Sequence, residues 1–423
     1  MLEILFPCFV VLLLLGVPIA VSLGAASLLA ITLGSNISLV ILPQKLMNGI
    51  NGFPFMAIPL FLFAGNVMAE AKISEKLIAL AALMVGKLPG GLAHVSTGAS
   101  ALFGAISGSA PATTAAIGGV MIPTMVQRGY KPEYAAAVVA ASGALGLIIP
   151  PSLSMVIYGV LSGTSIGSLF MCGILPGILI ATTLILFNYI LAKRSGFVDT
   201  GNKTDKTPWE IVRESGLALI MPIIIMGGIY SGMFTPTESA GVACLYGVIV
   251  GVFIYRNLTF KSIGKLLMDT AESSAMVLFL MGMANLFSYI ITAEQVPQLV
   301  ERFILGFTSN PKVVMLLILA LLLIVGTFLD NVAALVLLVP TLMNIVQAVN
   351  IDPIYFGVFT IIALAVGQFT PPVGLNLFVA AGIAKQRLEP VAYQCLPYIL
   401  AYVSMLLLFI AVPWLLMALK YTS

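Results

Sequence analysis

The chain alternates long apolar stretches with short polar breaks, a pattern that predicts helices crossing a membrane. An apolar helix of about 20 residues spans the hydrocarbon core of a bilayer. After loops are removed, the 423 residues allow roughly a dozen crossings or re-entrant pieces. We expect unbroken spans near these ranges: 4–33, 53–70, 166–192, 214–232, 237–255, 271–292 and 391–418.

Two polar interruptions lie inside otherwise apolar stretches, and each is followed by a pair of prolines. The first runs from Ser107 to Pro111, and the second from Gly326 to Asn331. Helices break in a bilayer only where protein or a water-filled cavity satisfies the freed backbone groups. Matched breaks in two halves of a membrane protein indicate a transported-solute site. We therefore expect two re-entrant helical hairpins with tips at these interruptions. Two broken transmembrane helices are expected at the proline pairs, near 133–163 (Pro150-Pro151) and 353–384 (Pro371-Pro372).

The spacing of prolines indicates that the second half repeats the first. Pro123 and Pro340 follow the two tips at an offset of 217 (340 − 123), and the proline pairs keep an offset of 221 (371 − 150). A mildly amphipathic segment precedes each hairpin, Ser74–Leu88 in the first half and Glu294–Thr308 in the second. We expect interfacial arm helices there, with ordinary short loop helices as the alternative.

The distribution of basic residues predicts the orientation and favours re-entrant hairpins. Cytoplasmic loops carry an excess of Lys and Arg, so the polar stretch 193–213 is placed in the cytoplasm. Treating either hairpin as a single crossing moves basic loops to the wrong side. The first hairpin then opens to the cytoplasm and the second to the outside, so the repeats are inverted and the C-terminus is periplasmic. On this map four of the 19 Lys and Arg face outward: Lys45, Arg302, Lys312 and Lys420.

Composition agrees with an all-α polytopic membrane protein and excludes several other classes. The chain is 60% hydrophobic and 8% charged, with a mean hydropathy of +1.13, whereas soluble domains carry about 25% charge. Four scattered cysteines and a single histidine, His94, cannot build a zinc site. There is no Walker A loop, HExxH motif, carboxylate dyad or His partner for a nucleophile. We expect no enzyme and no ATP-driven motor.

The repeat divides the chain into five segments. Two of them carry the hairpins and broken helices, and three form a scaffold. The expected divisions are 1–70 (N-terminal scaffold), 71–165 (transport repeat 1), 166–270 (central scaffold with the cytoplasmic loop 193–213), 271–385 (transport repeat 2) and 386–423 (C-terminal scaffold).

Hairpin tips and helix breaks expose helix ends within the membrane. Helix N-termini suit an anion, and helix C-termini suit a cation. Helix N-termini present unpaired N–H groups to a carboxylate. Helix C-termini and unwound turns present carbonyl oxygens to a cation such as Na⁺. Asp330 is the single acidic residue deep in a hairpin, and we expect it to bind solute or to stabilise the tip, with N-capping as the alternative. The candidate substrate-binding residues are Thr113, Thr114, Ser152, Asp330, Asn331, Gly374 and Asn376.

These motifs resemble the large membrane subunit of tripartite ATP-independent periplasmic (TRAP) transporters. The resemblance covers almost the whole chain. It is carried by the segments Ser107–Pro123, Gly129-Tyr130, Ile149–Ser152, Phe234–Glu238 and Thr370–Gly374. It implies an elevator-type ion-transporter-like fold and a sodium-coupled elevator transporter of the bacterial inner membrane, with Na⁺ as the coupling ion. It also implies two partners, a small four-helix membrane subunit and a periplasmic substrate-binding protein.

The resemblance further implies two sodium sites built largely from backbone carbonyls, and no other metal. The sialic-acid members look most similar, which makes sialic acid the first expectation for the cargo. A C4-dicarboxylate or another organic acid is an alternative, as is a stand-alone sodium/dicarboxylate symporter of similar fold. The implied sites are Ser107, Ser109, Gly146, Ile149 and Pro150 for the first ion, and Gly326, Thr327, Gln368 and Thr370 for the second.

Overall fold

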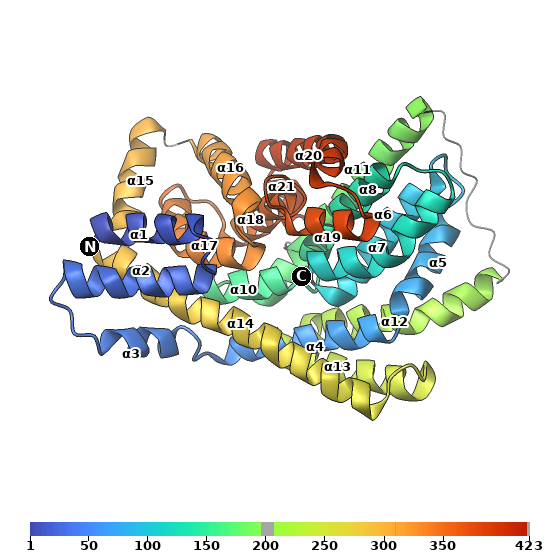
Figure 1. The fold of residues 1–423 in the computed structure, drawn as a ribbon, viewed down its shortest axis with the longest axis horizontal. Coiled ribbons are helices and arrows are strands. Elements are labelled where there is room, and N and C mark those ends of the chain that lie inside the picture. Colours follow the sequence, from blue (N-terminus) through green and yellow to red (C-terminus); the bar gives the residue numbers. More distant parts are fainter. Residues whose placement is uncertain (196–206, 309, 421–423) are drawn as a thin grey trace.

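The computed structural model describes residues 1–195, 207–308 and 310–420, and all regular elements within them are helical. A 3₁₀ turn, Phe53–Met56, precedes α4, and a π turn, Val250–Ile254, follows α13. The helices, drawn in Figure 1, are α1 (Leu2–Leu14), α2 (Ile19–Gly34), α3 (Ile41–Asn48), α4 (Ala57–Glu70), α5 (Ile73–Val85), α6 (Gly91–Ser107), α7 (Ala110–Gln127), α8 (Pro132–Gly143), α9 (Leu145–Ile148), α10 (Leu153–Ser162), α11 (Ile166–Ser195), α12 (Pro208–Tyr230), α13 (Pro236–Ile249), α14 (Phe260–Ala293), α15 (Val296–Phe307), α16 (Pro311–Phe328), α17 (Asn331–Ala348), α18 (Pro353–Gly367), α19 (Leu375–Ala384), α20 (Leu388–Ala411) and α21 (Trp414–Met417).

The described helices are those of a polytopic membrane protein, which confirms the predicted class. Eight helical segments are long and apolar enough to cross a bilayer, and a bent pair raises the number to nine. The bent pair is α8–α9 with α10, which turns by 43° at the first proline pair. The expected spans at 53–70, 166–192, 214–232, 237–255 and 271–292 fall on helical segments. The expected span at 391–418 is helical only as far as Ala411, because Val412 and Pro413 separate α20 from the short α21. Residues 196–206 of the predicted loop lie outside the described residues.

The expected single span at 4–33 is wrong, because this segment folds into two short helices. Gly16 adopts a left-handed conformation (φ +78°), and Pro18, which has no N–H, precedes α2. A Cβ on Gly34, at the end of α2, would lie 3.3 Å from the Cα of Met1. The helices α1 and α2 therefore run antiparallel, side by side (Figure 1). The amine of Met1 forms an ion pair with Glu294 at 3.6 Å, so the chain starts beside the end of α14.

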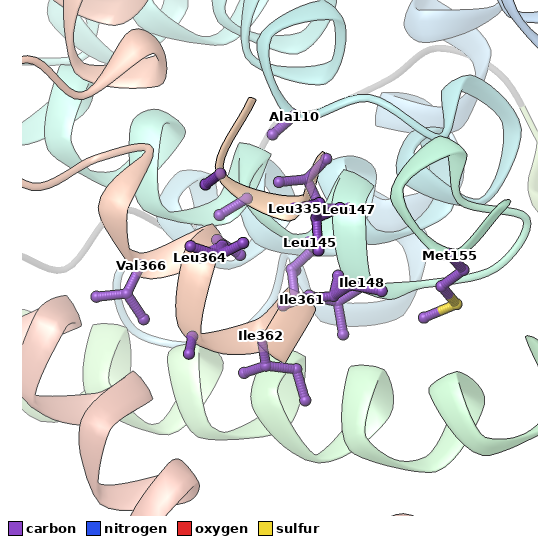
Figure 2. Close-up of a cluster of buried hydrophobic side chains, with 14 of the residues drawn as sticks. Ala110, Leu145, Leu147, Ile148, Met155, Leu335, Ile361, Ile362, Leu364 and Val366 are labelled. Carbon is purple, nitrogen blue, oxygen red and sulfur yellow. The ribbon is translucent and has the colours of Figure 1, made fainter. Parts of the chain in front are cut away.

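The two broken helices run antiparallel, and each packs against the opposite half. The hydroxyl of Tyr158, near the end of α10, donates to the carbonyl of Pro353 at the start of α18 (2.7 Å). The amide of Asn376, at the start of α19, donates to the carbonyl of Ala140 within α8 (3.1 Å). The pairs α7–α19 and α10–α17 make the matching contacts between the halves. Figure 2 shows the buried apolar cluster where α9, α10, α17 and α18 meet.

Helices also occupy the two amphipathic segments that precede the hairpins. Contacts from residues 215–257 hold the first, α5, and the turn before it. Ser215 of α12 donates to the carbonyl of Lys76 in α5 (2.9 Å), and Asn257 donates to the carbonyl of Ala71, which lies between α4 and α5 (3.2 Å). The ammonium of Lys76 lies 2.9 Å from the ring centroid of Tyr255. The second, α15, packs against α17.

The helices α11 and α20, which we expected in the scaffold, pack mainly against the hairpins and broken helices. α11 contacts α6, α9 and α18, whereas α20 contacts α8, α18 and α19. A buried polar network joins them. Asn188 of α11 donates to Thr97 of α6 (3.0 Å) and accepts from Tyr398 of α20 (2.6 Å). Thr97 in turn lies 3.0 Å from the hydroxyl of Ser142 in α8. This network could not be predicted from the sequence, because its members lie far apart along the chain.

Candidate functional site

The first polar interruption forms a tight turn between α6 and α7 that docks on the first helix break. Gly108 is left-handed (φ +61°), and a Cβ there would lie 2.8 Å from the carbonyl oxygen of Pro151. The carbonyl of Gly108 accepts the N–H of Leu153, the first residue of α10, at 3.2 Å. Ser109 caps α7 by accepting the N–H of Ala112. The glycine therefore permits a close approach of backbone to backbone.

Three of the residues expected at the first sodium site come together at this turn. The hydroxyl of Ser107 lies 2.8 Å from that of Thr113, which donates to the carbonyl of Ser109 (2.7 Å). A Cβ on Gly146 would lie 2.6 Å from the carbonyl oxygen of Ser109. Thr113, which we expected to bind substrate, thus belongs to the same oxygen cluster. The remaining two residues, Ile149 and Pro150, follow Gly146 as the helix ends.

The second polar interruption docks on the second break by the equivalent bond. The N–H of Val373, beside the proline pair, donates to the carbonyl of Thr327 at 3.2 Å. A Cβ on Gly367 would lie only 2.1 Å from the carbonyl oxygen of Gly326. Both proline pairs contain a cis peptide bond, Pro150-Pro151 and Pro371-Pro372. The two tips therefore share one mode of attachment.

The second break offers oxygen atoms of the kind that a sodium ion binds. The carbonyl of Gln368 accepts the N–H of Asn376 (2.8 Å), and the hydroxyl of Thr370 donates to the carbonyl of Val366 (2.6 Å). Gly374 is left-handed (φ +55°), and a Cβ there would lie 2.9 Å from the carbonyl oxygen of Thr370. The side-chain oxygen of Gln368 is buried without a hydrogen-bond partner. An unpaired buried oxygen beside carbonyls fits a cation ligand.

Most of the predicted substrate-binding residues are buried, and several of them form hydrogen bonds or close contacts with neighbouring helices. Asn331 donates to the hydroxyl of Ser154, and Ser152 donates to the carbonyl of Leu147 (2.5 Å). A Cβ on Gly143 would lie 2.0 Å from the hydroxyl of Thr114. The buried members of the predicted set are Thr113, Thr114, Ser152, Asn331, Gly374 and Asn376.

Asp330 is the exposed member of the predicted set, and it caps a helix. Its carboxylate accepts the N–H of Val332 in the first turn of α17 (3.0 Å). A negative charge is favourable at this helix end. Contact with solute remains a prediction for this carboxylate. Other exposed residues at the tips and breaks include Ala112, Phe328, Pro371, Pro372 and Val373.

The described residues contain no group of three or more His, Cys, Asp or Glu side chains that could hold a metal ion. Fold and site together define a multi-pass membrane permease with two matched, oxygen-lined helix breaks.

A family comparison agrees with this class. Residues 6–415 match the family described as tripartite ATP-independent periplasmic transporter, DctM component. The chain therefore belongs to this family of large permease components and is a transporter subunit, not an enzyme. Members of the family act in a system that includes a small membrane subunit and a periplasmic binding protein.

Several curated relatives align with most of the chain. The isethionate TRAP transporter permease protein DctMQ of Oleidesulfovibrio alaskensis is 44% identical over 97% of this chain, which spans 65% of that longer protein. The C4-dicarboxylate large permease DctM of Rhodobacter capsulatus is 34% identical, with 97% of this chain and 96% of the relative covered. The sialic acid large permease SiaM of Vibrio cholerae is 36% identical, with 91% and 90% covered.

A solved structure has a similar fold. The YdaH transporter of Alcanivorax borkumensis superposes with a TM-score of 0.63 over 98% of this chain and 99% of that one. The two sequences are 18% identical, so this likeness concerns the fold alone.

Proposed function

We propose that this chain imports an organic acid across the bacterial inner membrane by sodium-coupled elevator transport. A periplasmic binding protein delivers the acid, and a small four-helix subunit completes the membrane complex. One observation carries the proposal. Two hairpin-like tips, 217 to 221 residues apart in the sequence, dock on two helix breaks by equivalent backbone hydrogen bonds, Leu153 to Gly108 and Val373 to Thr327.

Each docked tip places oxygen acceptors beside a helix break, which suits the coupling ion. The first proposed site consists of Ser107, Ser109, Gly146, Ile149 and Pro150. We include Thr113 as well, because its hydroxyl contacts Ser107 and Ser109. The second comprises Gly326, Thr327, Gln368 and Thr370. Carbonyl and hydroxyl oxygens replace the water that a sodium ion loses on entry. Sodium binding then stabilises the docked tips, which links ion occupancy to the shape of the solute site.

The N-terminus of α7, at the first tip, suits the acid group of the cargo better than the N-terminus of α17 at the second tip. The N-terminus of α7 is capped by the neutral side chain of Ser109, and Ala112 next to it is exposed. The N-terminus of α17 is capped by the carboxylate of Asp330, which repels a second negative charge. A carboxylate or sulfonate at the first tip meets N–H groups and a partial positive charge.

Packing indicates which helices move together. The buried Asn188 links α11, α6 and α20, so moving the first hairpin against α11 or α20 would break these hydrogen bonds. Leaving such buried groups unpaired costs about 1–3 kcal/mol each. We therefore assign α11 and α20 to the mobile unit rather than to the scaffold. The scaffold then consists of α1–α4 and α12–α14, with α5 and α15 as the arms.

The relatives with a printed substrate transport different organic acids, which supports an organic acid as the cargo but does not select one. Their printed substrates are isethionate, C4-dicarboxylates, sialic acid and 2,3-diketo-L-gulonate. Isethionate is the substrate of the relative that is 44% identical, and sialic acid that of one that is 36% identical. Isethionate, a C4-dicarboxylate and sialic acid are the first three compounds to test.

The test is uptake of each radiolabelled acid into proteoliposomes that contain this chain and its small subunit. An inward Na⁺ gradient and the purified binding protein are each supplied or withheld. Uptake of one acid that needs both supports the proposal and names the cargo. Uptake that needs Na⁺ but not the binding protein refutes the delivery step and favours a stand-alone symporter. Uptake that ignores the Na⁺ gradient refutes sodium coupling.

A further inference from the structure

Two cavities of similar size lie at equivalent positions in the two repeats. One, of about 460 Å³, is lined at the turn between α7 and α8 by Gly129, Tyr130, Lys131 and Tyr134. The other, of about 410 Å³, is lined at the turn between α17 and α18 by Asn350, Ile351, Asp352 and Tyr355. Each residue of the second set lies 221 positions after its counterpart in the first. The repeat that builds the helix breaks has therefore also built two pockets.

The two pockets lie at opposite ends of one helix. Gln394 and Pro397, near the start of α20, line the first pocket. Ile410, Pro413 and Trp414, at and beyond the end of α20, line the second. Gln394 and Ile410 lie roughly 24 Å apart along the helix, at about 1.5 Å rise per residue. This separation is close to the ~30 Å thickness of the hydrocarbon core, so each pocket falls near one interface of the bilayer.

The surface of α20 between the pockets has the features of a helix that faces lipid. Tyr393 is 72% exposed at one end, and Trp414 is 63% exposed just beyond the other. Aromatic residues of this kind collect at both interfaces of a membrane. Four large apolar side chains between them are exposed, each by at least 42%: Leu396, Leu400, Leu407 and Leu408. Acyl chains can lie along this face from either interface.

Each pocket presents a lysine to its occupant. Lys131 carries the one charge among the described residues that line the first pocket. In the second pocket, Asp352 is paired with Lys420 at 2.6 Å, which leaves Lys312 as the further cation. The ammonium of Lys312 donates to the carbonyl of Ala411 (3.2 Å), which holds it at the end of α20. A basic group, an aromatic ring and an adjoining apolar surface match a phosphate headgroup with its acyl chains.

We propose that the two pockets bind the headgroups of anionic phospholipids, one in each leaflet. Both volumes lie within the ~300–1,000 Å³ of small-molecule sites. A pocket repeated at both membrane faces fits a ligand present in both leaflets. A periplasmic protein reaches only one face, and the cargo site is expected near the midplane. Lipid binding at these pockets requires only that the chain is a membrane permease. It therefore does not depend on whether transport is coupled to sodium.

Lipid retention by the purified complex tests this proposal. Native mass spectrometry would count bound phospholipid during titration with phosphatidylglycerol or phosphatidylcholine. We expect two retained phosphatidylglycerol molecules in the wild type and one in either Lys131→Gln or Lys312→Gln. The affinity of the altered pocket should fall about fivefold, as loss of one basic group near a phosphate implies. Lys87→Gln and Lys45→Gln, outside the pockets, serve as controls and should retain two.

A fluorescence titration reads the second pocket by itself. The chain has two tryptophans, so Trp209→Phe leaves Trp414 as the single reporter. Lys312→Gln should shift the phosphatidylglycerol titration of Trp414, and Lys131→Gln should not. Equal retention of phosphatidylcholine, or equal retention by the double lysine variant, would overturn the proposal. So would saturation by soluble glycerol 3-phosphate alone, or a Trp414 response to the binding protein but not to lipid.

Discussion

Gly367 provides the sharpest test of the second ion site. It is the last residue of α18, where the carbonyl of Gly326 at the second tip lies against it. A Cβ on Gly367 would lie 2.1 Å from that oxygen, 2.3 Å from the carbonyl carbon and 2.7 Å from the Cα. All three are backbone atoms, so no side chain can rotate away. The substitution Gly367→Ala must push the tip off the helix break.

The size of the effect follows from the cost of overpacking. Inserting a methyl group into a packed site costs about 1–3 kcal/mol, which equals a factor of about 5 to 140 in an equilibrium constant. If sodium binds only when the tip is docked, its half-saturation concentration should rise by this factor. The helix itself should tolerate alanine, which favours helix by about 1 kcal/mol over glycine.

Sodium-dependent thermal stabilisation of the detergent-purified complex measures this constant without knowledge of the cargo. Gly382→Ala is the matched control, because Gly382 lies in α19 with no atom within 4 Å of an added Cβ. The control should titrate like the wild type. A Gly367→Ala variant that folds and titrates like the wild type would refute the assignment of the second tip to sodium binding.

Three further predictions concern other contacts. Thr113→Val removes the hydroxyl that contacts Ser107 and Ser109 at the first tip, and it should raise the half-saturation concentration of sodium about fivefold. The control Thr124→Val loses only a hydrogen bond within α7 and should leave that concentration unchanged. Asn188→Ala should destabilise the complex by about 2–4 kcal/mol in thermal unfolding, because it leaves buried partners unpaired. Burial raises the pKa of Asp352, but hydrogen bonds from Lys420 and two backbone N–H groups outweigh it and lower the pKa below its ordinary value. The ion pair therefore stabilises the fold above the unfolded-state pKa and is lost as pH falls through the lowered one. Lys420→Gln should cost less than about 1 kcal/mol at pH 7 and nothing at a pH below that pKa.

The sequence was informative wherever local chemistry decides the structure. Proline and glycine set the helix breaks at Pro150 and Pro371 and the tight turn at Gly108, and these residue types restrict the backbone wherever they occur. Most spans could be predicted as well, because an apolar stretch of about 20 residues is long enough to cross the bilayer as a helix. The prediction of a span at 4–33 was wrong, since the apolar residues on both sides of Gly16 and Pro18 hid the turn between α1 and α2.

Contacts between distant segments could not be predicted in this way. Asn188 and Tyr398 are separated by 210 residues, and neither belongs to a motif. The polar residues Asn331 and Asn376 read as solute ligands because both lie beside breaks. In the structure their amides connect one half of the protein to the other. A single sequence shows that a polar group is costly in a membrane, but not which buried partner satisfies it.

Those two asparagines connect the two halves of the proposed mobile unit. Each tip is docked within its own half through Gly108 or Thr327, and each half is tied to the other through Asn376 or Asn331. If sodium binds at one break as proposed, it should stabilise backbone that is hydrogen-bonded, through one buried amide, to the opposite half. Two ion sites are coupled when both shift the conformational equilibrium of one structural element that they share. Here the two hydrogen-bonded breaks would be that element. Asn331→Ala should therefore lower the cooperativity of sodium binding more than it lowers the affinity of either site. Sodium titrations of thermal stability would show this as a Hill coefficient that falls toward one, and an unchanged coefficient would refute the link.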